Sequence, residues 1–143
     1  MPTFHPKEIL REAQKAEKEG NARIASNHYA TLGIYLLKRS KAKEAKVVID
    51  RAIQLSPSSA RLYIQRARCE IALERPVEAR AAMDLFSHYA IERKKVEAYT
   101  PYLEAQLKEY PQLRKGFYEA VLQIDRTDSF AFLGLARAQK QCI

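Results

Sequence analysis

Apolar residues recur at intervals of three and four along most of the chain, which is the period of an amphipathic helix. Between residues 29 and 57, large and small residues follow a fixed order. This order is Tyr29, Leu32, Gly33, Leu36, Ala45, Ile49, Ala52 and Pro57. Val, Ile and Thr do not alternate with polar residues as they would in strands. The pattern therefore predicts an all-α fold of about eight helices and no sheet.

Short segments rich in Gly, Pro, Asn, Asp or Ser divide the chain into pieces of helical length. They are Gly20-Asn21, Ser40, Pro57 to Ser59, Arg75-Pro76, Thr100-Pro101, Tyr110-Pro111 and Asp125 to Asp128. Pro76 and Pro111 suit the first turn of a helix, where a backbone N–H has no helical partner, and Thr100 before Pro101 is typical of an N-cap. Because the connections are short, successive helices should pack antiparallel.

Several positions recur further along the chain at one constant interval. The matched pairs are Tyr29 with Tyr63, Gly33 with Ala67, Ala45 with Ala79, and Ile49 with Met83. A fixed period of this length is typical of stacked helical repeats, in which each unit packs on the next. We expect the small residues where two helix backbones approach most closely, with the large ones filling the space around that contact.

Residues 26–59 resemble the tetratricopeptide repeat, a helix-turn-helix of about 34 residues with a W-x2-L-G-x2-Y, A-x3-F and final P pattern. The ordered residues from Tyr29 to Pro57 occupy all eight positions of that pattern. Residues 60–93 keep the frame but depart from the pattern at Arg66, Glu70, Phe86 and Ile91. The resemblance implies a right-handed superhelix of antiparallel helix pairs.

The resemblance also divides the single domain, residues 1–143, into a cap and successive repeats. The expected boundaries are 1–25 for an N-terminal capping helix, 26–59 and 60–93 for two repeats, 94–128 for a degenerate third repeat, and 129–143 for a C-terminal helix. Ala136 follows Ala67 by two repeat intervals plus a single position, so one inserted residue keeps the array in frame. Pro101 falls where a helix should be running, which leaves the fold of residues 94–110 open.

The chain carries 25 Lys and Arg against 17 Asp and Glu, a formal charge of +8. Such a charge favours acidic partners, which include acidic peptides, nucleic acid and anionic lipid. No apolar run approaches the roughly 18 residues that span a bilayer, and the N-terminal residues lack the apolar segment of a signal peptide. Cys69 and Cys142 lie far apart and are interpreted as reduced thiols. We therefore expect a cytoplasmic protein without a membrane span.

No catalytic motif and no metal-ligand spacing is found in the sequence. With only four glycines, the chain has no Gly-rich loop to hold a phosphate. His5, His28 and His88 share no helical face and are interpreted as structural. Most carboxylates lie three or four residues from Lys or Arg, as on a solvated helix. We expect no enzyme, no catalytic residue, no metal and no cofactor.

In a stack of such repeats, the first helix of each repeat lines the concave side, and residues spaced by four, three and four share one face. The candidate partner-binding residues are Asn27, Thr31, Ile34 and Lys38 in the first repeat, Arg61, Gln65 and Arg68 in the second, and Phe130, Leu133 and Arg137 in the last helix. Their amides and guanidinium groups can bind the backbone and carboxylates of an extended peptide. We expect a non-catalytic adaptor or scaffold for a protein or peptide, which the net charge predicts to be acidic. The alternative that these are merely exposed helix residues stays open.

A different class of partner is indicated by the run from Lys38 to Lys46, which places five basic residues around one turn. An RNA-binding helical repeat protein is therefore the second candidate, although a basic turn without interleaved aromatic residues is more often solvated. Arg66 is expected to pair with Glu70 or Glu78 while its aliphatic stem packs inward.

The segment from Ser129 to Ala136 is apolar on nearly every face of a helix. We expect Phe132, Leu135 and Ala136 to pack back on the preceding repeat, and Phe130 and Leu133 to point toward the concave side. A face of this kind should contact another chain, either a second copy, which gives a homodimer, or the partner. The alternative is that residues 94–110 fold over it.

Overall fold

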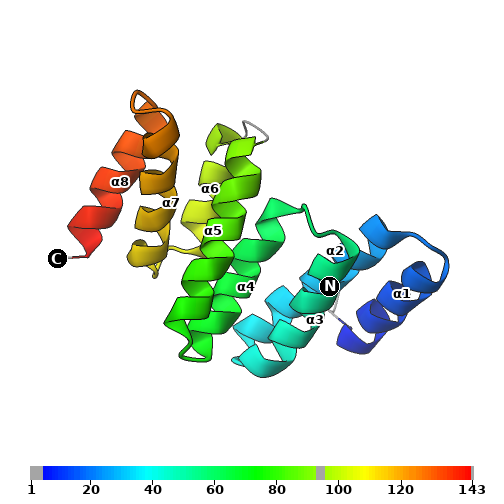
Figure 1. Cartoon of the computed structure of the whole chain (residues 1–143). Coiled ribbons are helices and arrows are strands. Elements are labelled where there is room, and N and C mark those ends of the chain that lie inside the picture. Colours follow the sequence, from blue (N-terminus) through cyan, green and yellow to red (C-terminus); the bar gives the residue numbers. More distant parts are fainter. Residues whose placement is uncertain (1–4, 93–95, 143) are drawn as a thin grey trace.

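The computed structural model describes residues 5–92 and 96–142, and in these residues the chain forms helices and no strand. The eight helices of the described ranges are α1 (Pro6–Lys18), α2 (Ala22–Lys38), α3 (Ala42–Leu55), α4 (Ala60–Ala72), α5 (Pro76–Glu92), α6 (Val96–Gln106), α7 (Pro111–Ile124) and α8 (Ser129–Gln141). Figure 1 shows them in a row, with α1 at one end and α8 at the other. The prediction of an all-α fold is confirmed.

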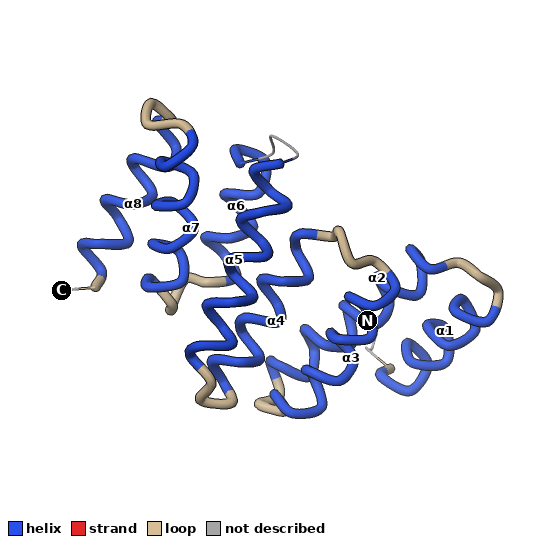
Figure 2. Tube along the Cα trace, viewed as in Figure 1, coloured by secondary structure: helices blue, strands red, loops and turns tan. Residues whose placement is uncertain are grey.

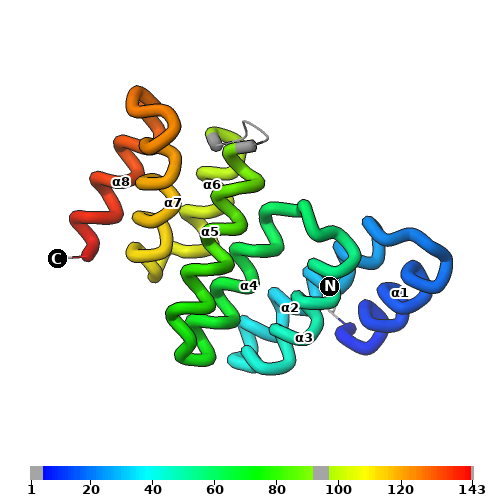
Figure 3. Tube along the Cα trace, in the orientation of Figure 1, coloured from blue at the N-terminus to red at the C-terminus, as the bar shows by residue number. Residues whose placement is uncertain are grey.

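Neighbouring helices pack as pairs along this row. α2 packs on α3 and α4 on α5, while α1 covers α2 and α8 covers α7. Short loops join the helices at the described connections, and successive helices run in opposite directions (Figures 2 and 3). Contacts also join α2 to α4, α4 to α6, and α5 to α7, so alternate helices are neighbours. The architecture is therefore repeat-like, with each helix pair packed on the next.

The α2–α3 contact forms around Gly33, as expected for a small residue at a close approach. A Cβ atom at Gly33 would overlap the Cδ1 atom of Ile49, closer than real side chains come. Ala45, Ile49 and Ala52 of α3 are fully buried. A larger residue at position 33 would require the Ile49 side chain or the two helices to move.

The helix α6 differs from the prediction for its region. It begins at Val96 and continues through Pro101, so Thr100 lies inside the helix and is not its N-cap. A proline inside a helix removes a backbone hydrogen bond and costs about 3 kcal/mol. Burial of Tyr99 and Leu103 on α6, and of Leu107 in the turn that follows it, offsets that cost, since Leu103 and Leu107 are completely inaccessible to solvent.

The helix α8 is rotated relative to the expectation. Ala131, Gly134 and Ala138 face α7 and are buried, whereas Phe132 is 64% exposed and Ala136 is exposed. A Cβ atom at Gly134 would overlap the ring of Tyr118. The prediction that Phe132 and Ala136 pack back on the preceding repeat is therefore wrong, because only small residues fit against that ring.

Phe130 and Leu133 of α8 are exposed, at 46% and 60%. The described part of residues 94–110 leaves both side chains uncovered, so the alternative in which this segment buries them is also wrong. In the described ranges, none of the helices combines the length and apolar character that crossing a bilayer requires.

The ion pairs between α3, α4 and α5 also differ from the prediction. Arg66 Nε lies 3.5 Å from Asp50 Oδ1 on α3, instead of pairing with Glu70 or Glu78. Glu70 is buried, and its carboxylate forms ion pairs with Lys46 Nζ and Arg75 Nε, each at 3.3 Å. The close packing of α3 on α4 brings Asp50 within reach of Arg66. It also turns Lys46, one member of the basic run, toward the interior.

Candidate functional site

The predicted residues on α2 lie on the protein surface. Asn27, Thr31 and Lys38 are exposed and Ile34 is half-buried. Thr31 Oγ1 donates a hydrogen bond to the Asn27 carbonyl at 2.9 Å, which leaves the hydroxyl oxygen available as an acceptor. This stripe can therefore contact a partner directly.

The predicted residues on α4 all contact α6, and they differ in how far solvent reaches them. Gln65 is only 1% exposed, and its Nε2 donates to the Tyr102 hydroxyl and, at 3.0 Å, to Gln106 Oε1. Arg68 Nη1 donates to Gln65 Oε1 and Gln106 Oε1, both at 2.7 Å. Gln65 is thus a structural contact between helices and is not accessible to a partner. The sequence does not reveal this contact, because it leaves the position of α6 open.

Arg61 is exposed and rests on two aromatic rings from α6. Its guanidinium carbon lies 5.1 Å from the ring centroid of Tyr102 and 5.7 Å from that of Tyr99. Burial raises the pKa of the Tyr102 hydroxyl, against the lowering effects of the Gln65 hydrogen bond and of the Arg61 and Arg68 charges. Tyr102 therefore stays neutral, and its ring supports the guanidinium through a cation–π contact.

We refer to Arg61 and Arg68 as the arginine pair. Over the described residues, neither guanidinium of the arginine pair forms an ion pair with a carboxylate; their contacts are aromatic rings and neutral amides. Other arginines do have carboxylate partners, as Arg51 has Glu17 and Arg75 has Glu78. The arginine pair is therefore a site of uncompensated positive charge that can bind a carboxylate bidentately.

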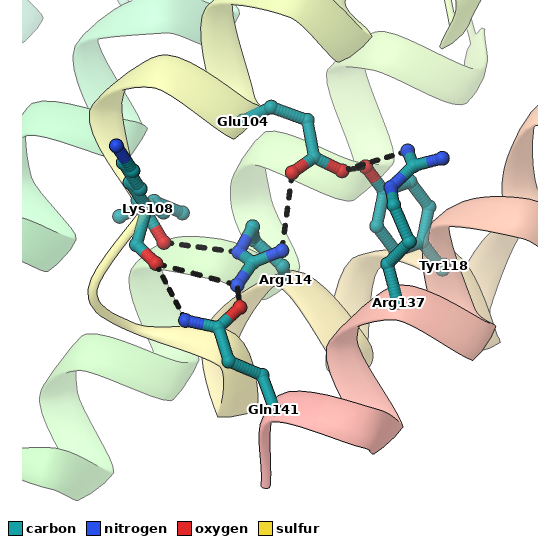
Figure 4. A network of polar contacts seen from close by, with 7 residues as sticks. Glu104, Lys108, Arg114, Tyr118, Arg137 and Gln141 are labelled. Atoms are coloured by element: carbon teal, nitrogen blue, oxygen red, sulfur yellow. Dashed lines mark hydrogen bonds and ion pairs between the residues drawn. The ribbon is translucent and has the colours of Figure 1, made fainter.

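The last predicted basic residue, Arg137 on α8, belongs to an internal network around Glu104 (Figure 4). Arg137 Nη2 donates to Glu104 Oε1 at 3.2 Å, and Arg114 Nη1 donates to Glu104 Oε2 at 3.1 Å. The Tyr118 hydroxyl donates to the same carboxylate. The charge of Arg137 is thus already shared with Glu104, whereas the neighbouring Phe130 and Leu133 remain open.

Sequence reasoning missed Arg114, which lies almost completely buried at the start of α7. Its Nε donates to the Leu107 carbonyl at 3.0 Å, and its Nη2 contacts Gln141 Oε1 and the Lys108 carbonyl. Arg114 therefore joins the C-terminal ends of α6 and α8 to α7. The sequence gives one indication that Arg114 is buried, because it lies among the apolar residues that form one side of α7.

The Glu104 carboxylate is held in its charged form by this network. Burial alone would raise its pKa, but hydrogen bonds from Tyr118 and Arg137 and the charge of Arg114 together lower it. Burial and the hydrogen bond to Glu104 raise the pKa of the Tyr118 hydroxyl, which remains a donor. Glu104 is thus ionised at neutral pH and connects α6, α7 and α8.

No cluster of metal-ligating side chains is found among the described residues, and the buried cysteine is not a reactive thiolate. No three His, Cys, Asp or Glu side chains there are grouped to hold a metal ion. Cys69 is buried, and burial together with the Asp50 charge raises the pKa of its thiol to about 12. This cysteine is therefore a protonated core residue at neutral pH.

Comparison with protein-family models and with curated proteins gives no match for this chain. Its function is therefore inferred from the geometry of the site and from the resemblance carried by the sequence pattern.

Proposed function

We propose that the chain is a tetratricopeptide-type right-handed superhelix that acts as a non-catalytic adaptor or scaffold. Its partner is an acidic protein or peptide that binds across α2 and α4. The observation that carries this proposal is the uncompensated charge of the arginine pair on α4, a helix in contact with α2, which carries the exposed stripe. In a repeat of this type, first helices lie side by side and form one continuous surface for an extended segment.

The geometry of Arg61 favours the binding of a carboxylate. Because its guanidinium is stacked on Tyr99 and Tyr102, less side-chain freedom is lost when a ligand binds. A planar guanidinium held in this way presents its N–H groups to a carboxylate in a fork. Lys38 adds a second positive charge, and Asn27 offers an amide for the backbone of an extended peptide.

An RNA-binding protein remains the second candidate, supported by the exposed Lys41 in the turn before α3 and the exposed Lys43 in the first turn of α3. Two other members of that basic run have contacts within the chain. Lys46 pairs with Glu70 and Asp50, and the Arg39 guanidinium lies 5.5 Å from the Tyr35 ring centroid. The ion pairs of Lys46 reduce the charge available to a phosphate backbone, whereas Arg39 keeps its charge, and this partial neutralisation of the run favours the protein partner.

The double variant Arg61→Glu with Lys38→Glu tests this proposal. Affinity capture with mass spectrometry should show at least about tenfold less bound partner than the parent, because both charges are reversed. A matched control, Arg80→Glu with Lys7→Glu, makes the same change of charge on exposed residues of α5 and α1 and should leave capture unchanged. Circular dichroism checks that each variant is folded.

Equal amounts of captured partner for both double variants would contradict a binding surface across α2 and α4. The RNA alternative is separated by a gel-shift assay with single-stranded RNA, in which affinity should fall steeply with salt if RNA is the partner. Absence of a shift at low salt would exclude it. We further propose a cytoplasmic location, since Cys69 and Cys142 are both free thiols and a reducing compartment keeps them so.

A further inference from the structure

The two ends of the helical row have surfaces of opposite character. The outward residues of α1 are polar, and Lys7, Glu8, Arg11, Glu12 and Lys15 are all exposed. At the other end, α8 packs on α7 in Figure 1 and exposes Phe132, Leu133 and Ala136. We refer to these three residues as the α8 face. Exposed helix surfaces are normally polar, so the apolar α8 face calls for a separate explanation.

The repeat interval identifies the residues of α4 that correspond to the α8 face. Phe132 and Ala136 follow Tyr63 and Ala67 of α4 by two repeat intervals plus the single inserted position. In α4 these positions are covered by α5, where Tyr89 stacks on Tyr63 with a centroid distance of 5.5 Å. Tyr63 is 4% exposed as a result, and Ala67 is fully buried. The α8 face is therefore the surface that α4 presents to a helix.

The charges around the α8 face indicate which kind of helix fits. α8 contains two basic residues, Arg137 and Lys140, and no acidic one. Lys140 lies four residues after Ala136 and therefore on the same side of the helix. The helix that covers α4 is itself acidic, because α5 carries Glu78, Asp84 and Glu92 against a single Arg80.

We propose that the α8 face binds an amphipathic, net-acidic α-helix of a partner protein. The apolar side of that helix covers Phe132, Leu133 and Ala136 as α5 covers α4, and its carboxylates lie near Lys140. The site is distinct from the proposed binding surface across α2 and α4, so one partner can occupy each. Binding in this way follows the helix-in-groove mode, in which apolar anchors repeat every three or four residues.

A second copy of the chain fits this surface less well. In a parallel pair of α8 helices Lys140 would face Lys140, and α8 itself carries no carboxylate that would compensate this charge. A head-to-tail contact would set the α8 face against the charged outer side of α1, which offers no matching apolar patch among its described residues. Charge and polarity therefore favour an acidic partner over self-association.

The test uses a labelled synthetic peptide with the sequence of residues 76–92 as the acidic helical probe. Fluorescence anisotropy should show saturable binding to the full chain. Phe132→Asp with Leu133→Asp should weaken it at least about tenfold, because apolar anchors dominate such contacts. The matched control Val47→Asp alters an equally exposed apolar residue, 68% accessible on α3, and should change the affinity less than about twofold.

A second peptide, in which Glu78, Asp84 and Glu92 are replaced by Lys, isolates the charge. It should bind the parent more weakly than the acidic peptide, and Lys140→Glu should reverse that preference. Equal binding of the two peptides, equal loss in Val47→Asp, or no saturable binding to the parent would each overturn the proposal. A concentration-dependent dimer in light scattering that Phe132→Asp abolishes would also overturn it, by identifying a second copy as the occupant.

Discussion

The α2–α3 pair and the α6–α7 pair lie on either side of the α4–α5 pair in the same array, yet different contacts hold them together. In α2–α3, Gly33 lets Ile49 approach so closely that no Cβ atom would fit between them. In the α6–α7 region, Pro101 stands two repeat intervals after Gly33, at the position that Ala67 occupies in α4. There the space is filled by rings, with Phe86 and Phe117 centroids 5.0 Å apart and Phe86 and Tyr99 centroids 5.7 Å apart.

This comparison shows that one architecture can be kept by two kinds of packing. A small residue at the contact sets the helix separation by itself, because both helices come into van der Waals contact there. Without it, large side chains fill the contact. The orientation of α6 is then fixed by directional contacts, which include Gln65 with Gln106 on one side and Glu104 with Arg114 on the other. Specific hydrogen bonds replace close backbone contact.

Removal of a ring should damage the α6–α7 region most. Phe117→Ala deletes a completely buried side chain that packs on Phe86 and Tyr118, so we expect a loss of about 3–5 kcal/mol in the free energy of unfolding. Chemical denaturation followed by circular dichroism measures it. As a control, Phe132→Ala removes the same kind of ring from an exposed position and should cost far less. Similar losses in both variants would mean that the rings are not the main packing element here.

The α2–α3 pair should be sensitive to added volume rather than to lost volume. Gly33→Leu forces a side chain into the contact with Ile49 and should destabilise the protein by about 1–3 kcal/mol or more. The matched variant Gly116→Leu makes the same substitution inside α7, where a Cβ atom meets nothing within 4 Å. That variant should be neutral or more stable by about 0.5–1 kcal/mol, since glycine is a poor helix former. A Gly33→Leu protein that melts like the parent would contradict close packing at this site.

The same difference explains what the sequence could predict. Helix number and the close contact at Gly33 follow from local spacing, because a small residue between large ones has few other uses in a helix pair. The path of α6 through Pro101 could not be predicted, since it depends on burial of Leu103 and Leu107 against residues distant in the sequence. Proline rules describe only the local cost.

The candidate site residues also divide into those that local spacing predicts and those that depend on the position of α6. The exposed stripe of α2 follows from spacing alone. Burial of Gln65 and the position of Arg114 follow from where α6 lies, so they cannot be derived without the position of that helix. The prediction for α8 is wrong because the repeat pattern indicates only that the position of Phe132 contacts a helix. The pattern does not indicate which neighbouring helix makes that contact.

The smallest expected effect concerns pH and compares the carboxylates of the two regions. Glu104 has a pKa below its usual value in the folded protein, so its contacts stabilise the fold above the pKa of the unfolded chain, and this stability is lost as the pH falls through the folded pKa. Glu104→Gln should therefore be less stable than the parent at pH 7, and the difference should shrink below about pH 4, where an unperturbed glutamate is protonated.

Glu17, which pairs with Arg51 beside the α2–α3 pair, also has a lowered pKa, chiefly through the Arg51 hydrogen bond, but this ion pair lies at the surface. Exposed pairs contribute little, so Glu17→Gln should show a smaller change over the same pH range. Denaturation of both variants between pH 3 and 7 measures the difference, and an equal or larger effect for Glu17→Gln would show that the Glu104 network does not hold α6 in place.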